Sequence, residues 1–185
     1  MDIIFKALNF AAKSHEGQKR GKDVDPQIPY ITHPVAVALI VSKIGVAEET
    51  IAAGLLHDVI EDCDITKEEL EREFGPRVAE MVDDLSEQNR SASWSERKEK
   101  AISRVKTMSN ETLLIKTADI IHNLTMLLET YEKIGMSVFN LYKAPYKDQV
   151  EMNKKRYQAL AEKWSENPLL PWLKDLVDKL ADLQS

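Results

Sequence analysis

LLIKTADIIHNLTMLL, residues 113–128, lies in a segment from 110 to 133 that is apolar at nearly every turn of a helix. A helix that is apolar on most of its faces lies in the centre of a domain. Its few polar residues need an explanation, because an unpaired polar group is costly to bury. They are Lys116, Asp119, His122 and Asn123. The segment therefore predicts a central helix whose polar residues have a task of their own.

Helical patterns continue on both sides of this segment, and strand-like alternation is nearly absent. With only six glycines and seven prolines in 185 residues, the sequence predicts an all-α fold. Thr32 and Thr66 are the expected N-caps of two helices; Thr66 forms a capping box with Glu69, and Ser93 forms another with Glu96. The other expected helices cover residues 2–15, 48–61, 76–86, 145–166 and 168–182.

Length and charge bound what the protein can be. The chain of 185 residues suits one domain spanning residues 1–185. Its formal net charge of −6 argues against binding to nucleic acid phosphates, but a small anionic ligand remains possible. No apolar run approaches the roughly 20 residues of a membrane span. The lone Cys63 fits a reducing compartment, so we expect a cytoplasmic protein, and the oligomeric state stays open.

A second stretch, LLHDVIEDCD at 55–64, places five ionisable groups directly after an apolar run. On a continuous helix, His57 lies above Glu61 and Asp58 above Asp62, so one face carries an imidazole and three carboxylates. Such crowding is unfavourable at neutral pH unless a cation neutralises it. A His beside an Asp is also common as a plain hydrogen-bonded pair near a helix end, and Glu61 and Asp62 could form a solvated helix end.

Two further residues are candidates for the same cluster. His33 follows a long loop, and Asp119 interrupts the apolar central helix. Together with His57 and Asp58 they offer a mixed nitrogen and oxygen ligand set, which suits manganese, iron, zinc or magnesium.

Three motifs carry a resemblance to a known family. YITHP (30–34), LLHDVIED (55–62) and KTADIIHNL (116–124) resemble the successive signatures of the HD phosphohydrolase superfamily. Their order and spacing are similar to those of the hydrolase domain of the RelA/SpoT alarmone enzymes, especially the stand-alone small hydrolases of the Mesh1 type. The similarity extends from about residue 5 to about residue 160 and implies an HD-domain helical bundle.

The resemblance also implies a chemistry. It assigns one divalent metal, usually Mn²⁺ in this family, to His33, His57, Asp58 and Asp119. It assigns Glu61 and Asp62 to the positioning and deprotonation of the attacking water. The substrate it implies is a small nucleotide, a guanosine that carries a 3′-pyrophosphate, with GDP or GTP and pyrophosphate as products.

Substrate-binding residues are implied in four places. Arg20 and Lys22 lie in the loop before His33, and Asn123 lies one helical turn beyond Asp119. Tyr146 is matched to a tyrosine near the nucleoside, with a core aromatic as the alternative interpretation. Arg97 and Lys98 resemble a basic pair that reaches phosphates, with a solvated surface as the alternative.

Two departures bear on the substrate. The loop at 21–30 is longer than the corresponding link in the alarmone enzymes and carries Asp23 and Asp25. The family motif ADRLHN here reads ADIIHN, so Ile120 replaces a basic residue, and Thr125 replaces another. Two other functions therefore stay open: an HD-type phosphohydrolase acting on another nucleotide, such as NADPH or a deoxynucleotide, and a non-catalytic nucleotide sensor.

Overall fold

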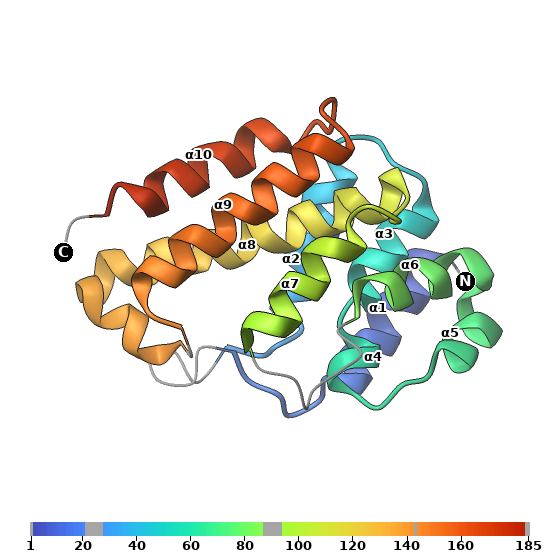
Figure 1. The fold of residues 1–185 in the computed structure, drawn as a ribbon. Coiled ribbons are helices and arrows are strands. Elements are labelled where there is room, and N and C mark those ends of the chain that lie inside the picture. Colours follow the sequence, from blue (N-terminus) through green and yellow to red (C-terminus); the bar gives the residue numbers. More distant parts are fainter. Residues whose placement is uncertain (1, 21–27, 87–93, 143, 184–185) are drawn as a thin grey trace.

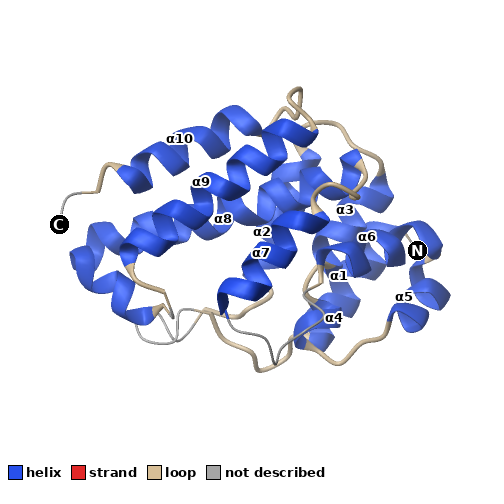
Figure 2. Cartoon of the chain, viewed as in Figure 1, coloured by secondary structure: helices blue, strands red, loops and turns tan. Residues whose placement is uncertain are grey.

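The computed structural model describes residues 2–20, 28–86, 94–142 and 144–183 (Figure 1). Within these residues the fold is all-α: Figure 2 shows helices joined by loops, and the described part contains no strand beyond one isolated bridge between Lys19 and Pro29. The elements, in chain order, are α1 (Ile3–Ser14), α2 (Thr32–Ser42), α3 (Glu48–Leu56), α4 (Val59–Asp62), α5 (Lys67–Phe74), α6 (Pro76–Leu85), α7 (Trp94–Arg104), α8 (Asn110–Ile134), the 3₁₀ helix η1 (Gly135–Leu141), α9 (Tyr146–Lys163) and α10 (Leu170–Ala181).

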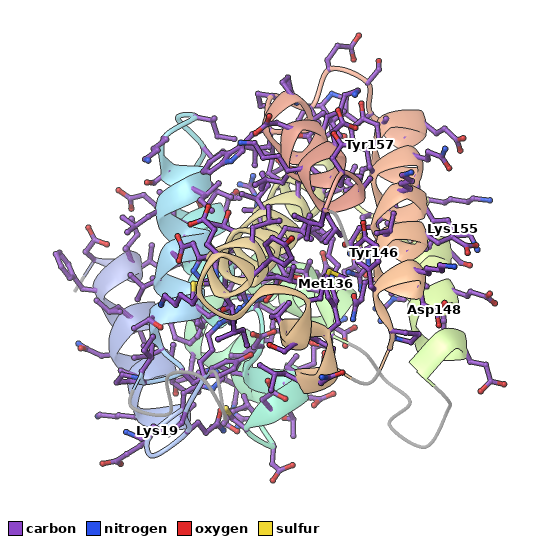
Figure 3. All side chains as sticks on the ribbon, turned by 90° about the vertical axis from the view of Figure 1, so that its left-hand side faces the viewer. Lys19, Met136, Tyr146, Asp148, Lys155 and Tyr157 are labelled. Atoms are coloured by element: carbon purple, nitrogen blue, oxygen red, sulfur yellow. The ribbon has the colours of Figure 1, made fainter. Side chains whose placement is uncertain are left out.

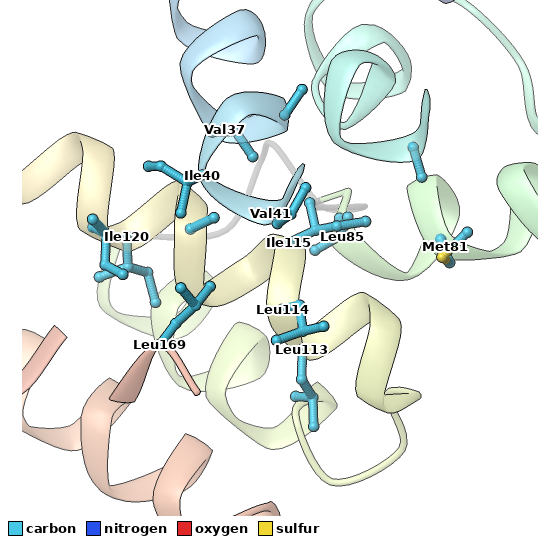
Figure 4. Close-up of a cluster of buried hydrophobic side chains, with 14 of the residues drawn as sticks. Val37, Ile40, Val41, Met81, Leu85, Leu113, Leu114, Ile115, Ile120 and Leu169 are labelled. Atoms are coloured by element: carbon cyan, nitrogen blue, oxygen red, sulfur yellow. The ribbon is translucent and has the colours of Figure 1, made fainter. Parts of the chain in front are cut away.

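Helix α8 forms the centre of the molecule, as its apolar sequence predicts. It packs against α2, α3, α6 and α10 (Figure 1). Leu113, Ile115 and Ile121 are fully buried on it. Figure 4 shows this part of the core, where side chains of α8 gather with Val37 and Val41 of α2. Because the middle of α8 is packed on several sides, Lys116 and Asp119 are largely buried there, and they contact each other and line a cavity.

Helix ends follow the expected local chemistry at several points. The Thr66 hydroxyl accepts a hydrogen bond from the Glu69 N–H at 3.2 Å, which confirms this residue as the N-cap of α5. Ser109 caps α8 in the same way, by accepting from the Thr112 N–H at 3.1 Å. Ser93, the other expected cap, lies outside the described residues.

The prediction for Thr32 was wrong. Helix α2 begins at Thr32 itself, with Ile31 as its N-cap residue. The Thr32 hydroxyl donates to the Pro29 carbonyl at 2.9 Å, so it closes the preceding turn rather than capping the helix.

The helix expected at 48–61 is also different. It is divided into α3, which ends at Leu56, and the short α4, which begins at Val59, so His57 and Asp58 lie at the junction. The chain also forms η1 after α8, where no element was expected. None of the described helices is both long and apolar enough to cross a membrane.

Candidate active site

Three separate elements bring the predicted metal residues together. His33 lies in the first turn of α2, His57 and Asp58 at the α3–α4 junction, and Asp119 in the middle of α8. His57 Nε2 lies 3.2 Å from His33 Nε2 and 3.2 Å from Asp58 Oδ2. His33 Nε2 lies 3.5 Å from Asp58 Oδ2 and 3.3 Å from Asp119 Oδ1. Four side chains from three distant parts of the sequence therefore converge on one point.

The second nitrogen of each imidazole is already engaged. His57 Nδ1 lies 2.9 Å from the Gly54 carbonyl oxygen, which can only accept, so Nδ1 carries a proton and Nε2 is the nitrogen that faces the cluster. His33 Nδ1 lies 2.8 Å from His122 Nδ1, a nitrogen-to-nitrogen contact in which one ring donates and the other accepts. With His33 as the donor, its Nε2 faces the cluster as a lone pair as well.

The carboxylates are oriented by three neighbours. Tyr30 donates its hydroxyl hydrogen to Asp58 Oδ2 at 2.7 Å. Asn123 donates to Asp119 Oδ1 at 2.6 Å, and Lys116 donates to Asp119 Oδ2 at 3.1 Å. Partners of this kind fix the orientation of ligands in metal sites, and their loss typically weakens metal binding.

The electrostatics of the cluster favour positive charge at its centre. Burial alone lowers the pKa of His57, but the carboxylates of Asp58 and Asp119 outweigh it and raise this pKa to about 9. Burial opposes ionisation of Asp58, yet His57 and His33 hold its pKa below the usual range. Burial also opposes ionisation of Asp119, but Lys116 and His33 hold the pKa of this carboxyl well below its usual range. The two carboxylates are therefore ionised, and His57 and Lys116 supply the positive charge beside them. A bound cation would take the place of the second proton of His57 and leave Nε2 able to coordinate.

Two nearby groups stay neutral. Burial, together with the neighbouring His33, lowers the pKa of His122 to about 4, so at neutral pH this ring can accept the proton of His33 Nδ1. Burial and the adjacent Asp58 raise the pKa of Tyr30, so its hydroxyl keeps the hydrogen that it donates.

The cluster fits a divalent cation. Ligand atoms placed about 2.1 Å from a metal lie roughly 3.0 Å apart in octahedral and 3.4 Å apart in tetrahedral geometry. The ligand atoms of His33, His57 and Asp58 all lie within 4.8 Å of one another, and their closest separations of 3.2 Å fall in this range. Asp119 reaches the same point at 3.3 Å from His33 Nε2. The donor set of imidazole nitrogens and carboxylate oxygens suits a divalent metal.

Glu61 and Asp62 lie beside this cluster. They line the same cavity of about 190 Å³ as the four predicted metal residues. Although the helix breaks at residues 57 and 58, the Asp62 N–H still bonds to the Asp58 carbonyl at 2.8 Å, so α4 keeps the carboxylates on the side of the cluster. Gln18 donates to the Asp62 carbonyl oxygen at 3.1 Å and ties α4 to the loop after α1.

The predicted substrate residues are only partly brought together. Asn123 lines the cavity, and Arg20 Nη2 donates to Asn123 Oδ1 at 2.5 Å. Lys22, like Asp23 and Asp25, lies outside the described residues. Arg97 and Lys98 belong to α7, but their side chains lie outside the described part of the structure.

Tyr146 is placed differently from the prediction. Figure 3 labels Tyr146 on α9. Its hydroxyl lies 3.0–3.1 Å from the carbonyl oxygens of Leu180, Ala181 and Leu183, at and just beyond the end of α10, and its ring packs against Phe139. It is not among the residues that line the described cavity. The structure thus favours the alternative interpretation, in which Tyr146 is a packing residue between α9 and α10.

Three residues of the cavity were missed as site residues. Tyr30 opens the YITHP motif, so its position next to His33 was the available signal. Lys116 was recognised as unusual in the central helix but received no role. Arg156 lies on α9 within an ordinary amphipathic pattern, which gives no sign that it reaches the cavity.

Fold and cluster together define an all-α protein with a histidine–aspartate site of the HD type, and the chain belongs to the HD domain family, whose model matches residues 7–144. Among its relatives is the zebrafish (Danio rerio) guanosine-3′,5′-bis(diphosphate) 3′-pyrophosphohydrolase MESH1, which is 38% identical over 125 residues, covering 66% of this chain and 67% of that protein. The enzyme of the same activity name from Vibrio cholerae is 42% identical over 133 residues.

The bacterial relative is much longer. The match covers 69% of this chain and 18% of the Vibrio protein, so the chain spans less than a fifth of that enzyme. Solved structures agree with the fold over most of the chain. A metazoan SpoT orthologue that hydrolyses ppGpp superimposes with a TM-score of 0.77 at 27% identity, covering 100% of this chain and 98% of that one. The lmo0812 protein of Listeria monocytogenes superimposes with a TM-score of 0.73 at 31% identity, covering 80% of this chain and 97% of that one.

Proposed function

We propose that this protein is a divalent-metal-dependent hydrolase that removes the 3′-pyrophosphate of guanosine-3′,5′-bis(diphosphate) and its triphosphate analogue. Water adds to phosphorus, the bond to the 3′ oxygen breaks, and the products are GDP or GTP and pyrophosphate. The observation that carries the proposal is the convergence of His33, His57, Asp58 and Asp119 beside Glu61 and Asp62 in one cavity. The activity names of the relatives support the choice of substrate.

Each group has a role in this proposal. His33, His57, Asp58 and Asp119 hold the cation, for which Mn²⁺ is our candidate. A divalent cation acidifies water and offsets the negative charge that develops on phosphoryl oxygens. Glu61 and Asp62 orient the attacking water and accept its proton, as carboxylates within hydrogen-bond reach can. Tyr30, Lys116 and His122 hold the cation ligands in place.

The nucleotide end of the site is assigned to Arg20 and Asn123. They are hydrogen-bonded to each other, and Asn123 also bonds to Asp119. These two hydrogen bonds connect the loop before α2 with the proposed cation ligand Asp119 on α8. A nucleotide that engages Arg20 is thereby placed at a fixed position relative to the cluster.

The direct test is product identification. The purified protein is incubated with Mn²⁺ and a panel of nucleotides that includes ppGpp, NADPH and deoxynucleoside triphosphates. Pyrophosphate and GDP formed from ppGpp support the proposal. Orthophosphate from another nucleotide, with ppGpp untouched, supports the alternative phosphohydrolase. Binding without turnover of any nucleotide supports a sensor.

Two variants separate metal binding from turnover. We expect Asp58→Ala to lose metal binding, because it removes one ligand and leaves the hydroxyl of Tyr30 without its acceptor. We expect Glu61→Gln to keep metal binding and lose turnover, because an amide cannot accept the proton of the water. Calorimetric titration with Mn²⁺ and a steady-state assay measure the two effects, and full activity in both variants would overturn the mechanism.

A further inference from the structure

Arg156 brings a cationic side chain to the cavity from a helix that the family match does not include. The match ends at residue 144, whereas Arg156 lies on α9. Helix α9 contacts α10 and α7 and forms one side of the molecule in Figure 1. Arg156 nevertheless lines the same cavity as Glu61, Asp62 and Asp119.

The side chain of Arg156 is held in a defined position. Its Nη1 donates to Asn153 Oδ1 at 3.3 Å. Asn153 is only 3% exposed, and its own Nδ2 donates to the Gln149 carbonyl at 2.8 Å, so the acceptor is fixed by the helix. Arg156 also lines a second, small cavity together with Ile120 and Leu160. The guanidinium is therefore oriented before any ligand arrives.

The other charged residues that line the cavity show why a cation from Arg156 matters for an anionic ligand. Four carboxylates line it, from Asp58, Glu61, Asp62 and Asp119, and the lysine and arginine of the described lining are Lys116 and Arg156. Lys116 forms an ion pair with Asp119 at 3.1 Å, so its charge serves the cation ligand. A phosphorylated substrate needs further positive charge on the wall away from the metal.

Ile120 of α8 is 3% exposed and lines both cavities together with Arg156. Beside this apolar side chain, Arg156 of α9 brings a cation to the wall of the larger cavity. A guanidinium offers five N–H donors in a planar fork that matches two phosphate oxygens at once.

We propose that Arg156 is a substrate-binding residue of this site that contacts the pyrophosphate group and thereby determines specificity for a phosphorylated ligand. The proposal rests on the proposed function in that the ligand carries a pyrophosphate. It differs from a purely structural role of Arg156, in which the guanidinium would only balance the carboxylates of the cavity.

The test uses inorganic pyrophosphate as the probe. Binding to the intact protein is measured by calorimetry with Mn²⁺ in excess over both components, for the wild type, Arg156→Gln, Arg156→Lys and Lys154→Gln. Lys154 is an exposed cation on the same helix and serves as the matched control. We expect Arg156→Gln to weaken pyrophosphate binding at least tenfold, Arg156→Lys to weaken it by a smaller factor of about three, and Lys154→Gln to leave it unchanged.

A second readout separates binding from structure. The Mn²⁺ affinity of Arg156→Gln is expected to stay within about twofold of the wild type. Pyrophosphate affinity unchanged in Arg156→Gln, or equal losses for Mn²⁺ and pyrophosphate, would overturn the proposal. Should Arg156→Gln fail to fold, Arg156→Lys decides, because unaltered pyrophosphate affinity in that variant contradicts a bidentate contact.

The steady-state assay with ppGpp distinguishes this proposal from the proposed function. We expect Arg156→Gln to raise KM at least tenfold and to change kcat by less than about threefold. If the wild type does not cleave ppGpp but its pyrophosphate binding depends on Arg156, the proposed function fails and this inference holds. If the wild type cleaves ppGpp and Arg156→Gln does so with the same KM, the inference fails and the proposed function holds.

Discussion

The hydroxyl of Tyr30 reaches Asp58 at 2.7 Å and holds one carboxylate oxygen in the cluster. We expect Tyr30→Phe to weaken Mn²⁺ binding roughly 10–100-fold, because the loss of a hydrogen-bond partner behind a metal ligand typically has this effect. Calorimetric titration with Mn²⁺ measures it. Tyr157→Phe, on α9, is the matched control for the loss of a phenolic hydroxyl and should bind Mn²⁺ as the wild type does. Equal Mn²⁺ affinity in Tyr30→Phe and the wild type would show that the hydrogen bond does not support the site.

At the scale of single residues, the sequence predicted the clustered histidines and aspartates better than the residues that support them. His57 and Asp58 stand out because charged groups follow an apolar run, and Asp119 stands out because it interrupts a buried helix. Arg156 does not stand out, because a cation on the polar face of an amphipathic helix looks the same whether it faces water or a cavity. For Tyr146 the sequence left two interpretations open, because a tyrosine between two helices and a tyrosine beside a nucleotide carry the same local pattern; its contacts in the structure favour the first.

At the scale of the elements, the position of the cluster depends on how α2 and α3 cross, because His33 lies in the first turn of α2 and His57 directly follows α3. Gly54 lies at this crossing, where a Cβ atom would meet the Ala38 Cα at 3.4 Å. The carbonyl of Gly54 also accepts the His57 Nδ1 hydrogen. The lack of a side chain at residue 54 therefore allows the two helices to approach closely while the backbone orients an imidazole.

Gly54→Val should separate these helices. We expect the free energy of unfolding to fall by about 1–3 kcal/mol, the usual cost of overpacking a core, and Mn²⁺ affinity to fall with it because His33 and His57 move apart. Urea unfolding in the presence of a chelator measures the first effect. Ala12→Val, at an exposed position of α1, is the control for placing valine in a helix. A stability loss no greater than in this control would contradict the close packing.

The junction between α3 and α4 shows what sequence periodicity cannot supply. The pattern of residues 48–61 is helical throughout, and the backbone at His57 and Asp58 stays in the right-handed helical region. At the interruption, Asp58 contacts Tyr30 and His57 contacts His33. Periodicity therefore predicted that helices exist here but not where they end, because it takes no account of such tertiary contacts.

For the whole molecule, we expect metal binding to be coupled to stability. The proposed ligand residues come from α2, the α3–α4 junction and α8, so a bound cation would link three elements of one core. At a free Mn²⁺ concentration 100 times the dissociation constant, binding adds about 2.7 kcal/mol to the free energy of unfolding. For a chain of this size that corresponds to a rise in Tm of roughly 5–11 °C.

Differential scanning calorimetry with Mn²⁺ and with a chelator measures this rise. Asp58→Ala is the control, because without one ligand the two conditions should give nearly equal Tm values. A wild-type Tm that does not respond to Mn²⁺ would mean that the native state has no preferential affinity for the ion.

At the same scale, the all-α class and the central position of α8 were predictable because they follow from hydrophobic pattern alone. The packing partners of α9 could not be predicted, because an amphipathic helix can turn its apolar face to several neighbours. That limit explains why the cavity wall supplied by α9 emerged only from the folded structure.

Anomalous diffraction from crystals soaked in Mn²⁺, recorded at the manganese absorption edge, tests the central claim most directly. We predict one strong peak within bonding distance of Nε2 of His33 and His57 and of a carboxylate oxygen of both Asp58 and Asp119. A fully soaked crystal with no peak at this point, or with its strongest peak elsewhere on the protein, would contradict the account.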